Sequence, residues 1–342
     1  MQPTKLAIVG CGAITESGHL PAALQSPLID VAALVDVRLD NARGLSRRFG
    51  LTCAVADTLE SVINLVEGVV IATPNHTHAA IAEVALTRGI ATLIEKPLTT
   101  QYADAMRLCD LADQMKTFIS VGYRSRFWPS VPLLKHLLDT SYLGRIQSFD
   151  YTFGTQSTWA AVSGFGIDRA MAGGGILIDA HVLDKVIFWF GEPTDFAFWD
   201  DSHGGVEATC KATARFEAPE GAFTGSILLS RSMDLEKRLV IDTDRFVCEL
   251  GESPRAQVTL REKARPDLVL EVRSRDLGQD GRSDFRLQLE EFVDNIRRPG
   301  KITIDGRFAA RSVKLTEAMY QRRQQLPEPW MIPSAAMERA AV

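Results

Sequence analysis

The stretch Leu6-Ala7-Ile8-Val9-Gly10-Cys11-Gly12 decides the fold of the first part of this chain. Four apolar residues run without polar alternation into a glycine pair, which predicts a buried strand that ends in a tight turn. Gly10 permits the turn, and Gly12 lets the backbone approach a pyrophosphate, which the N–H groups of a following helix favour. A lone Gly-x-Gly is weak evidence, so this prediction depends on its surroundings.

Further apolar runs at residues 31–35, 69–72, 92–94 and 118–121 repeat the pattern of the first strand. Helical stretches, at 78–88 and 102–115 among others, separate these runs, and such alternation predicts a parallel sheet built from βαβ units. Ligands bind beyond the carboxyl ends of the strands in such sheets. We therefore expect the segments that begin at Gly10, Asp36, Pro74 and Glu95 to share one crevice.

Asp36 follows the second predicted strand and strengthens the dinucleotide prediction. Its carboxylate would accept hydrogen bonds from the adenosine ribose and repel a 2′-phosphate, which favours NAD. Arg38 keeps NADP open as the alternative, because an arginine can pair with that phosphate. Thr15 stands where a glycine or alanine is usual in the fingerprint. A glycine turn with an unrelated surface aspartate is the competing interpretation.

The second half has a different pattern. Strands are predicted at 145–155, 207–216, 223–230, 238–250, 257–262 and 268–273, and several of them alternate polar and apolar residues. Amphipathic helices are expected at 284–297 and 308–324. The sequence thus predicts an α/β protein with a Rossmann domain over residues 1–122. An α+β substrate-binding and oligomerisation domain over 123–342 is expected to carry an open, mostly antiparallel sheet. The closing helices are candidates to pack back on the first domain.

Composition argues against several classes of protein. The 342 residues carry a net charge of −5, which gives no basic footprint for nucleic acid. No apolar run approaches the ~20 residues of a membrane span, and the first residues lack the apolar core of a signal peptide. The five cysteines form no C-x-x-C pair, so neither a zinc site nor a disulfide framework is indicated. A cytoplasmic protein is expected.

Several segments, taken in order, resemble one family over essentially the whole chain. They are Gly10-Cys11-Gly12-Ala13-Ile14, His19-Leu20-Pro21-Ala22, Pro74-Asn75-His76-Thr77-His78, Glu95-Lys96-Pro97, Gly122-Tyr123-Arg124-Ser125-Arg126-Phe127, Leu143-Gly144-Arg145-Ile146 and Gly173-Gly174-Gly175. The family is that of glucose–fructose oxidoreductase, inositol dehydrogenase and the rhizopine-catabolism protein (Gfo/Idh/MocA). The resemblance implies a Rossmann domain joined to an open-sheet domain, NAD(P)-dependent chemistry on a sugar or cyclitol carbon, and a homodimer or homotetramer through the C-terminal sheet.

Strand ends and the resemblance together give the expected cofactor-binding residues. These are Gly10, Gly12, Ala13, Ile14, Asp36, Val37, Arg38, Thr73, Pro74, Asn75, His78, Glu95 and Lys96. His76 and His78 also form an H-x-H pair, which can indicate a metal site. No carboxylate or cysteine lies at a supporting spacing, so no metal is predicted.

Lys96 is the first candidate for catalysis. Oxidation of a secondary alcohol needs a hydride acceptor and a group that takes the hydroxyl proton. Lys96 ends a strand at the expected crevice, and Pro97 favours an extended conformation there. The resemblance implies that this lysine contacts the reacting hydroxyl, that the following proline often has a cis peptide bond, and that Glu95 lies at the cofactor edge. A solvated lysine at a strand end is the alternative.

Asp179 and His181 are the second catalytic candidates. The family pattern places an aspartate after three glycines, a histidine four residues later and a second aspartate three beyond. Here His181 and Asp184 match that pattern, but a single residue separates Asp179 from His181. At i, i+2 on a helix two side chains point roughly 200° apart, so they cannot share a face. Asp184 is an alternative partner for His181, Lys185 is an extra cation, and a buried structural histidine is the competing interpretation.

Substrate contacts are expected from Lys96, Tyr123, Arg124, Arg126, Asp179 and His181. The two arginines favour an anionic substrate, with ordinary salt bridges as the alternative. The leading hypothesis is an oxidoreductase that moves a hydride between nicotinamide and a sugar, cyclitol or related polyol, as a sugar or inositol dehydrogenase does. Two others stay open: a redox-neutral epimerase or glycosidase-like enzyme with tightly held NAD, and a non-catalytic cofactor-binding sensor, which the shortened spacing favours.

Overall fold

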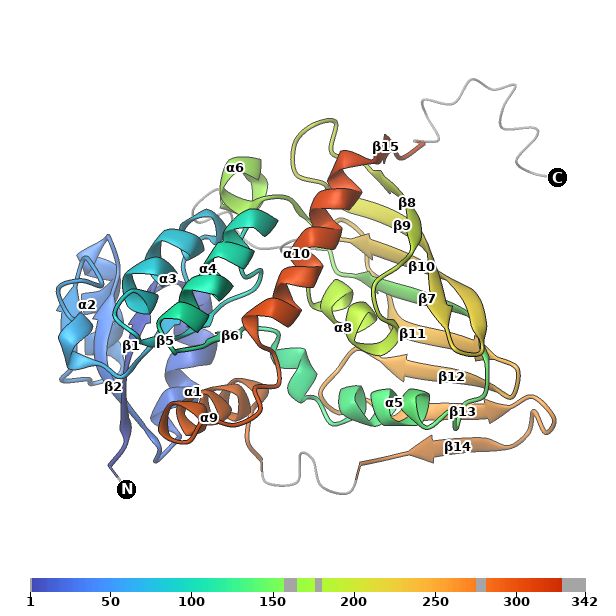
Figure 1. Cartoon of the computed structure of the whole chain (residues 1–342), viewed down its shortest axis with the longest axis horizontal. Coiled ribbons are helices and arrows are strands. Elements are labelled where there is room, and N and C mark those ends of the chain that lie inside the picture. The colour runs from blue at the N-terminus through green and yellow to red at the C-terminus, as the bar shows by residue number, and fades with distance from the viewer. Residues whose placement is uncertain (1, 157–164, 176–179, 275–280, 328–342) are drawn as a thin grey trace.

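The structure is a computed structural model that describes residues 2–156, 165–175, 180–274 and 281–327. It contains two sheets, and a layer of helices lies between them (Figure 1). None of the helices in these ranges combines the length and apolar character that a membrane crossing requires.

The first sheet is parallel and has the strand order β3-β2-β1-β4-β5-β6. Its strands are β1 (Thr4–Val9), β2 (Ile29–Val35), β3 (Ala54–Ala56), β4 (Gly68–Ile71), β5 (Ala91–Ile94) and β6 (Ile119–Val121). Every residue of β4, β5 and β6 is buried, as predicted from runs without polar alternation. Only the short edge strand β3 lacks a counterpart in the prediction, because three residues show no periodicity.

Helices cover both faces of this sheet. They include π-helix η1 (Thr15–His19), α1 (Leu20–Leu24), α2 (Leu39–Arg48), α3 (His78–Leu86) and α4 (Tyr102–Gln114). The two helices that close the second half, α9 (Asp284–Arg297) and α10 (Gly306–Gln321), join them. α9 packs against α1 and η1, and α10 against α4 and β6 (Figure 1). The core of the first sheet therefore includes residues from the end of the chain, such as Phe292 and Val313.

The second sheet has nine strands in the order β14-β13-β12-β11-β7-β10-β9-β8-β15. They are β7 (Ile146–Gly154), β8 (Asp195–Asp200), β9 (Thr209–Ala218), β10 (Gly221–Ser230), β11 (Leu235–Thr243), β12 (Phe246–Gly251), β13 (Val258–Glu262), β14 (Val269–Val272) and β15 (Arg323–Gln325). All neighbouring pairs are antiparallel except β10 with β7 and β15 with β8. The predicted fold class is therefore confirmed.

One expected strand proves to be two. Residues 238–250 form most of β11 and β12, which pair as a hairpin with Asp242 opposite Val247. The Thr243 hydroxyl accepts the N–H of Phe246 at 2.8 Å and closes the turn. A side-chain hydrogen bond of this kind closes a turn that contains no glycine or proline.

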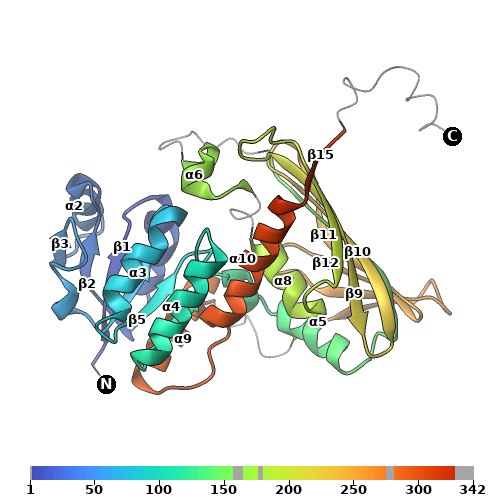
Figure 2. The same ribbon diagram turned by 45° about the horizontal axis from the view of Figure 1, so that its top comes forward.

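Helices α5 (Ser130–Asp139), α8 (His181–Phe190) and α10 cover one face of the second sheet (Figure 2). Along β9 the residues alternate between buried and exposed, and Lys211, Thr213, Arg215 and Glu217 point outward. The face opposite the helices is thus polar along this strand in the single chain. Its use as a subunit interface, like the domain boundary at residue 122, stays a prediction.

Candidate active site

The carboxyl ends of the first sheet bring the predicted cofactor residues to one edge. Backbone N–H groups that follow each strand bond to the neighbouring strand: Gly10 to Val35 at 2.8 Å, Glu95 to Ile71 at 2.8 Å and Gly122 to Ile94 at 2.7 Å. In spatial order the edge carries Asp36, Gly10, Thr73, Glu95 and Gly122. Loops that are distant in sequence thus become adjacent, as the parallel topology predicts.

The glycine turn has the form that a phosphate cradle requires. Gly10 has φ +95°, and a Cβ there would lie 2.4 Å from the Ala72 carbonyl oxygen. A Cβ on Gly12 would meet no atom within 4 Å, so the space beside it is open to a ligand. Thr15 is fully buried and its hydroxyl donates to the Gly10 carbonyl at 2.5 Å. Thr15, which stands where a glycine or alanine is usual, therefore adds a hydrogen bond to the turn.

Asp36 is bonded to the turn that it faces. One carboxylate oxygen accepts the N–H of Cys11 at 2.9 Å, and the other accepts the N–H of Arg38 at 2.9 Å. Ala13, Ile14 and Val37 are exposed around this turn, and Arg38 is exposed beside the carboxylate. The residues present fit an adenosine ribose and its phosphates. The carboxylate at the strand end can accept hydrogen bonds from the ribose, and the open backbone beside the glycines can approach the phosphates.

The loop after β4 is held from two sides. The buried Asn75 side chain donates to the carbonyl of Ala172, at the end of α6 (Arg169–Ala172), at 2.8 Å. The buried ring of His78 contacts the carbonyl oxygens of Pro97 and Thr73, both at 2.9 Å. Burial lowers the pKa of His78, against these contacts that favour its charged form. Asn75 and His78 therefore fix backbone around the edge.

His76 is exposed, with Nδ1 3.3 Å from the Met171 carbonyl oxygen. Within the described ranges no group of three or more histidine, cysteine, aspartate or glutamate side chains is placed to hold a metal ion.

Glu95, Lys96 and Pro97 leave β5 at the centre of the edge. The Lys96–Pro97 peptide bond is cis, and Lys96 is half-buried. Glu95 is buried and bonds to His19 at 2.8 Å. Burial opposes ionisation of Glu95. The hydrogen bond and the charge interaction with His19, followed by the positive charge of Lys96, outweigh it and lower the pKa of this carboxyl. Lys96 therefore stands beside an anion.

His181 is the first residue of α8 and faces the same region. Its Nδ1 lies 3.3 Å from the Ser125 hydroxyl oxygen, and its ring meets the Tyr123 ring edge-on at 5.8 Å. Burial, followed by the positive charges of Lys96, Arg124 and Lys185, holds the pKa of His181 well below its usual value. His181 is thus neutral at neutral pH, within the electrostatic reach of Lys96. Asp179 lies outside the described residues.

The remaining predicted substrate residues are turned towards protein groups. The Tyr123 hydroxyl bonds to Ser312 at 2.6 Å in the interior. Arg124, about one-third exposed, pairs with Asp284 at 2.5 Å. Arg126 is buried, lies 3.4 Å from both oxygens of Asp184, and stacks on Phe188.

These contacts give Arg126 a structural environment, and Asp184, the alternative partner for His181, faces Arg126 instead. Lys185 is also buried and pairs with Glu252.

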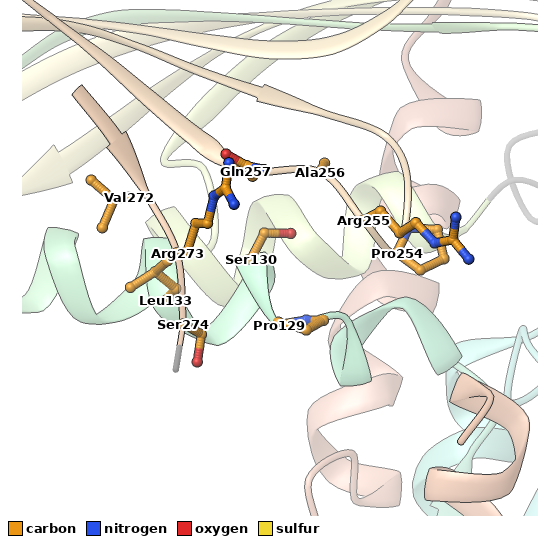
Figure 3. Close-up of a pocket in the computed structure, with 10 residues that line it drawn as sticks. All are labelled: Pro129, Ser130, Leu133, Pro254, Arg255, Ala256, Gln257, Val272, Arg273 and Ser274. Atoms are coloured by element: carbon orange, nitrogen blue, oxygen red, sulfur yellow. The ribbon is translucent and has the colours of Figure 1, made fainter. Parts of the chain in front are cut away.

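A cavity of about 200 Å³ lies elsewhere, between the start of α5, the turn that joins β12 to β13 and the end of β14 (Figure 3). Its lining includes Ser130, Arg255, Gln257 and Arg273. No predicted site residue lines it, so this cavity lies apart from the strand edge that carries the candidate active site.

A glycine turn, an acidic strand end and a strand-end lysine on one edge of a parallel sheet define an NAD-binding Rossmann domain. The family model described as "Oxidoreductase family, NAD-binding Rossmann fold" (GFO_IDH_MocA) matches residues 4–123. This match and the relatives below show that the first part of the chain is similar to the NAD-binding domain of the Gfo/Idh/MocA family.

The rhizopine catabolism protein MocA of Rhizobium meliloti is 33% identical over 204 residues, which cover 56% of this chain and 59% of that protein. D-glucoside 3-dehydrogenase of Escherichia coli K12 is 26% identical over 197 residues, or 56% and 55% of the two chains. The matched part thus spans little more than half the length of these relatives. The solved structure of a levoglucosan dehydrogenase in complex with NADH and L-sorbose shares the fold, with TM-score 0.80, 20% identity and coverage of 93% and 96%.

Three residues near the edge have no assigned role in the prediction: His19, Ser125 and Gly122. Their segments stand among those that carry the resemblance. Their contacts cross from one loop to another, so no spacing in the sequence reveals them.

Proposed function

We propose that this chain is an NAD-dependent oxidoreductase acting on a secondary alcohol or ketone carbon of a sugar, cyclitol or related polyol. The observation that carries the proposal is the common edge of Gly10, Asp36 and Lys96, with His181 within the electrostatic reach of the lysine. Relatives named for sugar dehydrogenation support the substrate class.

In this proposal bound NAD supplies the hydride acceptor, or the donor in the reverse direction. Lys96 exchanges a proton with the substrate hydroxyl, as a lysine positioned at a reacting hydroxyl can do in general acid–base catalysis. His181 is neutral, so it offers one N–H and one lone pair to a hydroxyl group. Asn75 and His78 hold the surrounding backbone in place.

The test incubates the protein with NAD and a panel of sugars, inositols and sugar acids while the absorbance of reduced nicotinamide is followed. We expect Lys96→Met to lower kcat by about 10²–10⁴-fold, the usual contribution of a general acid or base. Lys314→Met is the matched control, because Lys314 lies exposed on α10 and pairs with Glu192. Equal turnover by Lys96→Met and the unaltered protein would reject the proposed role.

Other outcomes separate the competing functions. Substrate conversion with retained NAD and no net reduction would instead indicate the redox-neutral enzyme. Cofactor binding without conversion of any substrate would indicate the sensor. We also propose a homodimer or homotetramer through the second sheet, and light scattering of the full chain tests it: a monomer at working concentration contradicts it.

A further inference from the structure

A buried pair lies behind the strand-end lysine. His19 Nε2 is 2.8 Å from Glu95 Oε1, and the two side chains are 1% and 11% exposed. A carboxylate removed from water to this degree stays ionised only when donors or cations compensate it. His19 supplies the donor on one side of Glu95, and Lys96 supplies the neighbouring cation.

An unusual helical turn brings His19 to that position. Residues Thr15–His19 form a π-helix, with the N–H of Leu20 bonded to the Thr15 carbonyl. Such a turn inserts an extra residue and re-aims the side chains after it, and it often occurs at functional sites. The His19 ring meets the Phe285 ring edge-on at 5.0 Å. A Cβ on Gly18 would lie 2.6 Å from that ring, so a glycine is needed for this packing.

The Glu95 carboxylate is confined on its other side. Its second oxygen accepts the N–H of Lys96 at 3.1 Å. A Cβ on Gly122 would lie 3.0 Å from that oxygen and from the Glu95 Cα. The carboxylate is therefore held between the π-helix and the backbone at Gly122, directly beside Lys96.

We propose that His19 is a positioning residue that keeps Glu95 ionised beside Lys96, and thereby sets the pH range in which Lys96 exchanges a proton with substrate. This inference rests on the proposed function and adds to it a pair of residues behind the reacting lysine.

The hydrogen bonding of His19 indicates which ring nitrogen donates to Glu95. The buried Nδ1 has no hydrogen-bond partner among the described residues. A neutral ring with its proton on Nε2 donates to Glu95 and leaves Nδ1 as a lone pair, whereas a second proton would be a buried N–H without an acceptor. With a donor directed at it, the Glu95 carboxylate keeps its negative charge beside Lys96.

Other charged groups around this pair are engaged elsewhere. Glu16, on the same π-helix, pairs with Arg48. From α9, Asp284 pairs with Arg124, whose guanidinium lies over Phe285. Among the described residues, His78 and Tyr123 are further titratable groups within the electrostatic range of Glu95. The pKa of Tyr123 is raised by burial and that of His78 is lowered by burial, so both stay uncharged near neutral pH.

The test compares His19→Leu with His19→Gln, whose amide Nε2 can replace the imidazole donor but cannot titrate. Without a donor Glu95 takes up a proton, so the negative charge of Glu95 beside Lys96 is lost and Lys96 releases its own proton at lower pH. We expect His19→Leu to move the lysine-dependent limb of the pH–rate profile down by about one pH unit or more. Glu95→Gln is expected to move it equally, and His19→Gln is expected to keep the original midpoint.

A second readout needs no turnover. Lysines are labelled by reductive ¹³C-methylation, and the Lys96 resonance is assigned by its loss in Lys96→Arg. Its titration midpoint should fall in His19→Leu and in Glu95→Gln, and be preserved in His19→Gln. An unchanged midpoint in folded His19→Leu and Glu95→Gln overturns the inference. A shifted midpoint in a protein that converts no polyol overturns the proposed function alone.

Discussion

The backbone N–H of Cys11 donates a 2.9 Å hydrogen bond to Oδ2 of Asp36. The carboxylate predicted to select the ribose therefore also supports the glycine turn. A change at this position alters two properties, and the choice of substitution separates them.

Asp36→Asn retains an acceptor for Cys11 but removes the charge, whereas Asp36→Ala removes both. We expect Asp36→Asn to keep its thermal stability while discrimination against NADP falls. Asp36→Ala should weaken NAD binding about tenfold or more, as the loss of charged hydrogen bonds predicts. Calorimetric titration with both nucleotides measures these effects. An unchanged NAD-to-NADP ratio in both variants would refute the role of the carboxylate.

Gly10→Ala is predicted to lower the stability of the protein, whereas Gly12→Ala is predicted to lower its affinity for NAD. At Gly10 the positive φ and the 2.4 Å approach to the Ala72 carbonyl should cost about 1–3 kcal/mol of folding free energy. At Gly12 nothing lies within 4 Å, so stability should hold while NAD affinity falls, because the methyl group occupies the phosphate space. Thermal unfolding and calorimetry are measured on both variants. Unchanged NAD affinity in Gly12→Ala would show that the phosphates do not bind beside Gly12.

His181 is expected to report the charge of Lys96. Burial and, after it, positive neighbours hold its pKa low, so removing one of these charges should raise that pKa. In Lys96→Met the imidazole resonances of His181 should titrate at higher pH, by several tenths of a unit or more. Lys314→Met serves as the distant control. NMR titration measures the change. Identical curves for Lys96→Met and the unaltered protein would show that the charge of Lys96 does not act on His181.

The buried pair of Lys185 and Glu252 predicts a pH-dependent loss of stability. Both side chains lie in the interior, and Lys185 is 5.1 Å from the Trp128 ring centre. Lys185→Met leaves a buried carboxyl without its cation and should cost about 3–5 kcal/mol, while Lys185→Met/Glu252→Leu should recover most of that. Denaturant unfolding measures each variant.

The sign of the pH effect follows from Glu252. Burial raises its pKa from 4.5 to about 8, so the folded state holds the proton over that range while the unfolded state releases it. The Lys185→Met protein should therefore lose stability as pH rises from about 5 to about 8. A flat profile in the single variant, or no recovery in the double variant, would contradict this account.

Local patterns were sufficient for most of the fold. Runs without alternation predicted the parallel strands, and the helices expected at 78–88 and 102–115 were placed to within a few residues. The turn inside residues 238–250 was missed because a threonine hydroxyl closes it. β8 and β15 were also missed; β15 has three residues and lies at the edge of the second sheet.

The sequence by itself determined the glycine turn, the acidic strand end and the strand-end lysine, since each follows from residue order within one βα unit. Tertiary structure decided the partners: His19 behind Glu95, Ser125 beside His181, and Arg126 turned inward to Asp184. These contacts join residues between 56 and 76 positions apart, through elements whose relative placement depends on packing of the whole core. A short-range pattern carries no information about such distances, so only the folded chain shows which side chains meet.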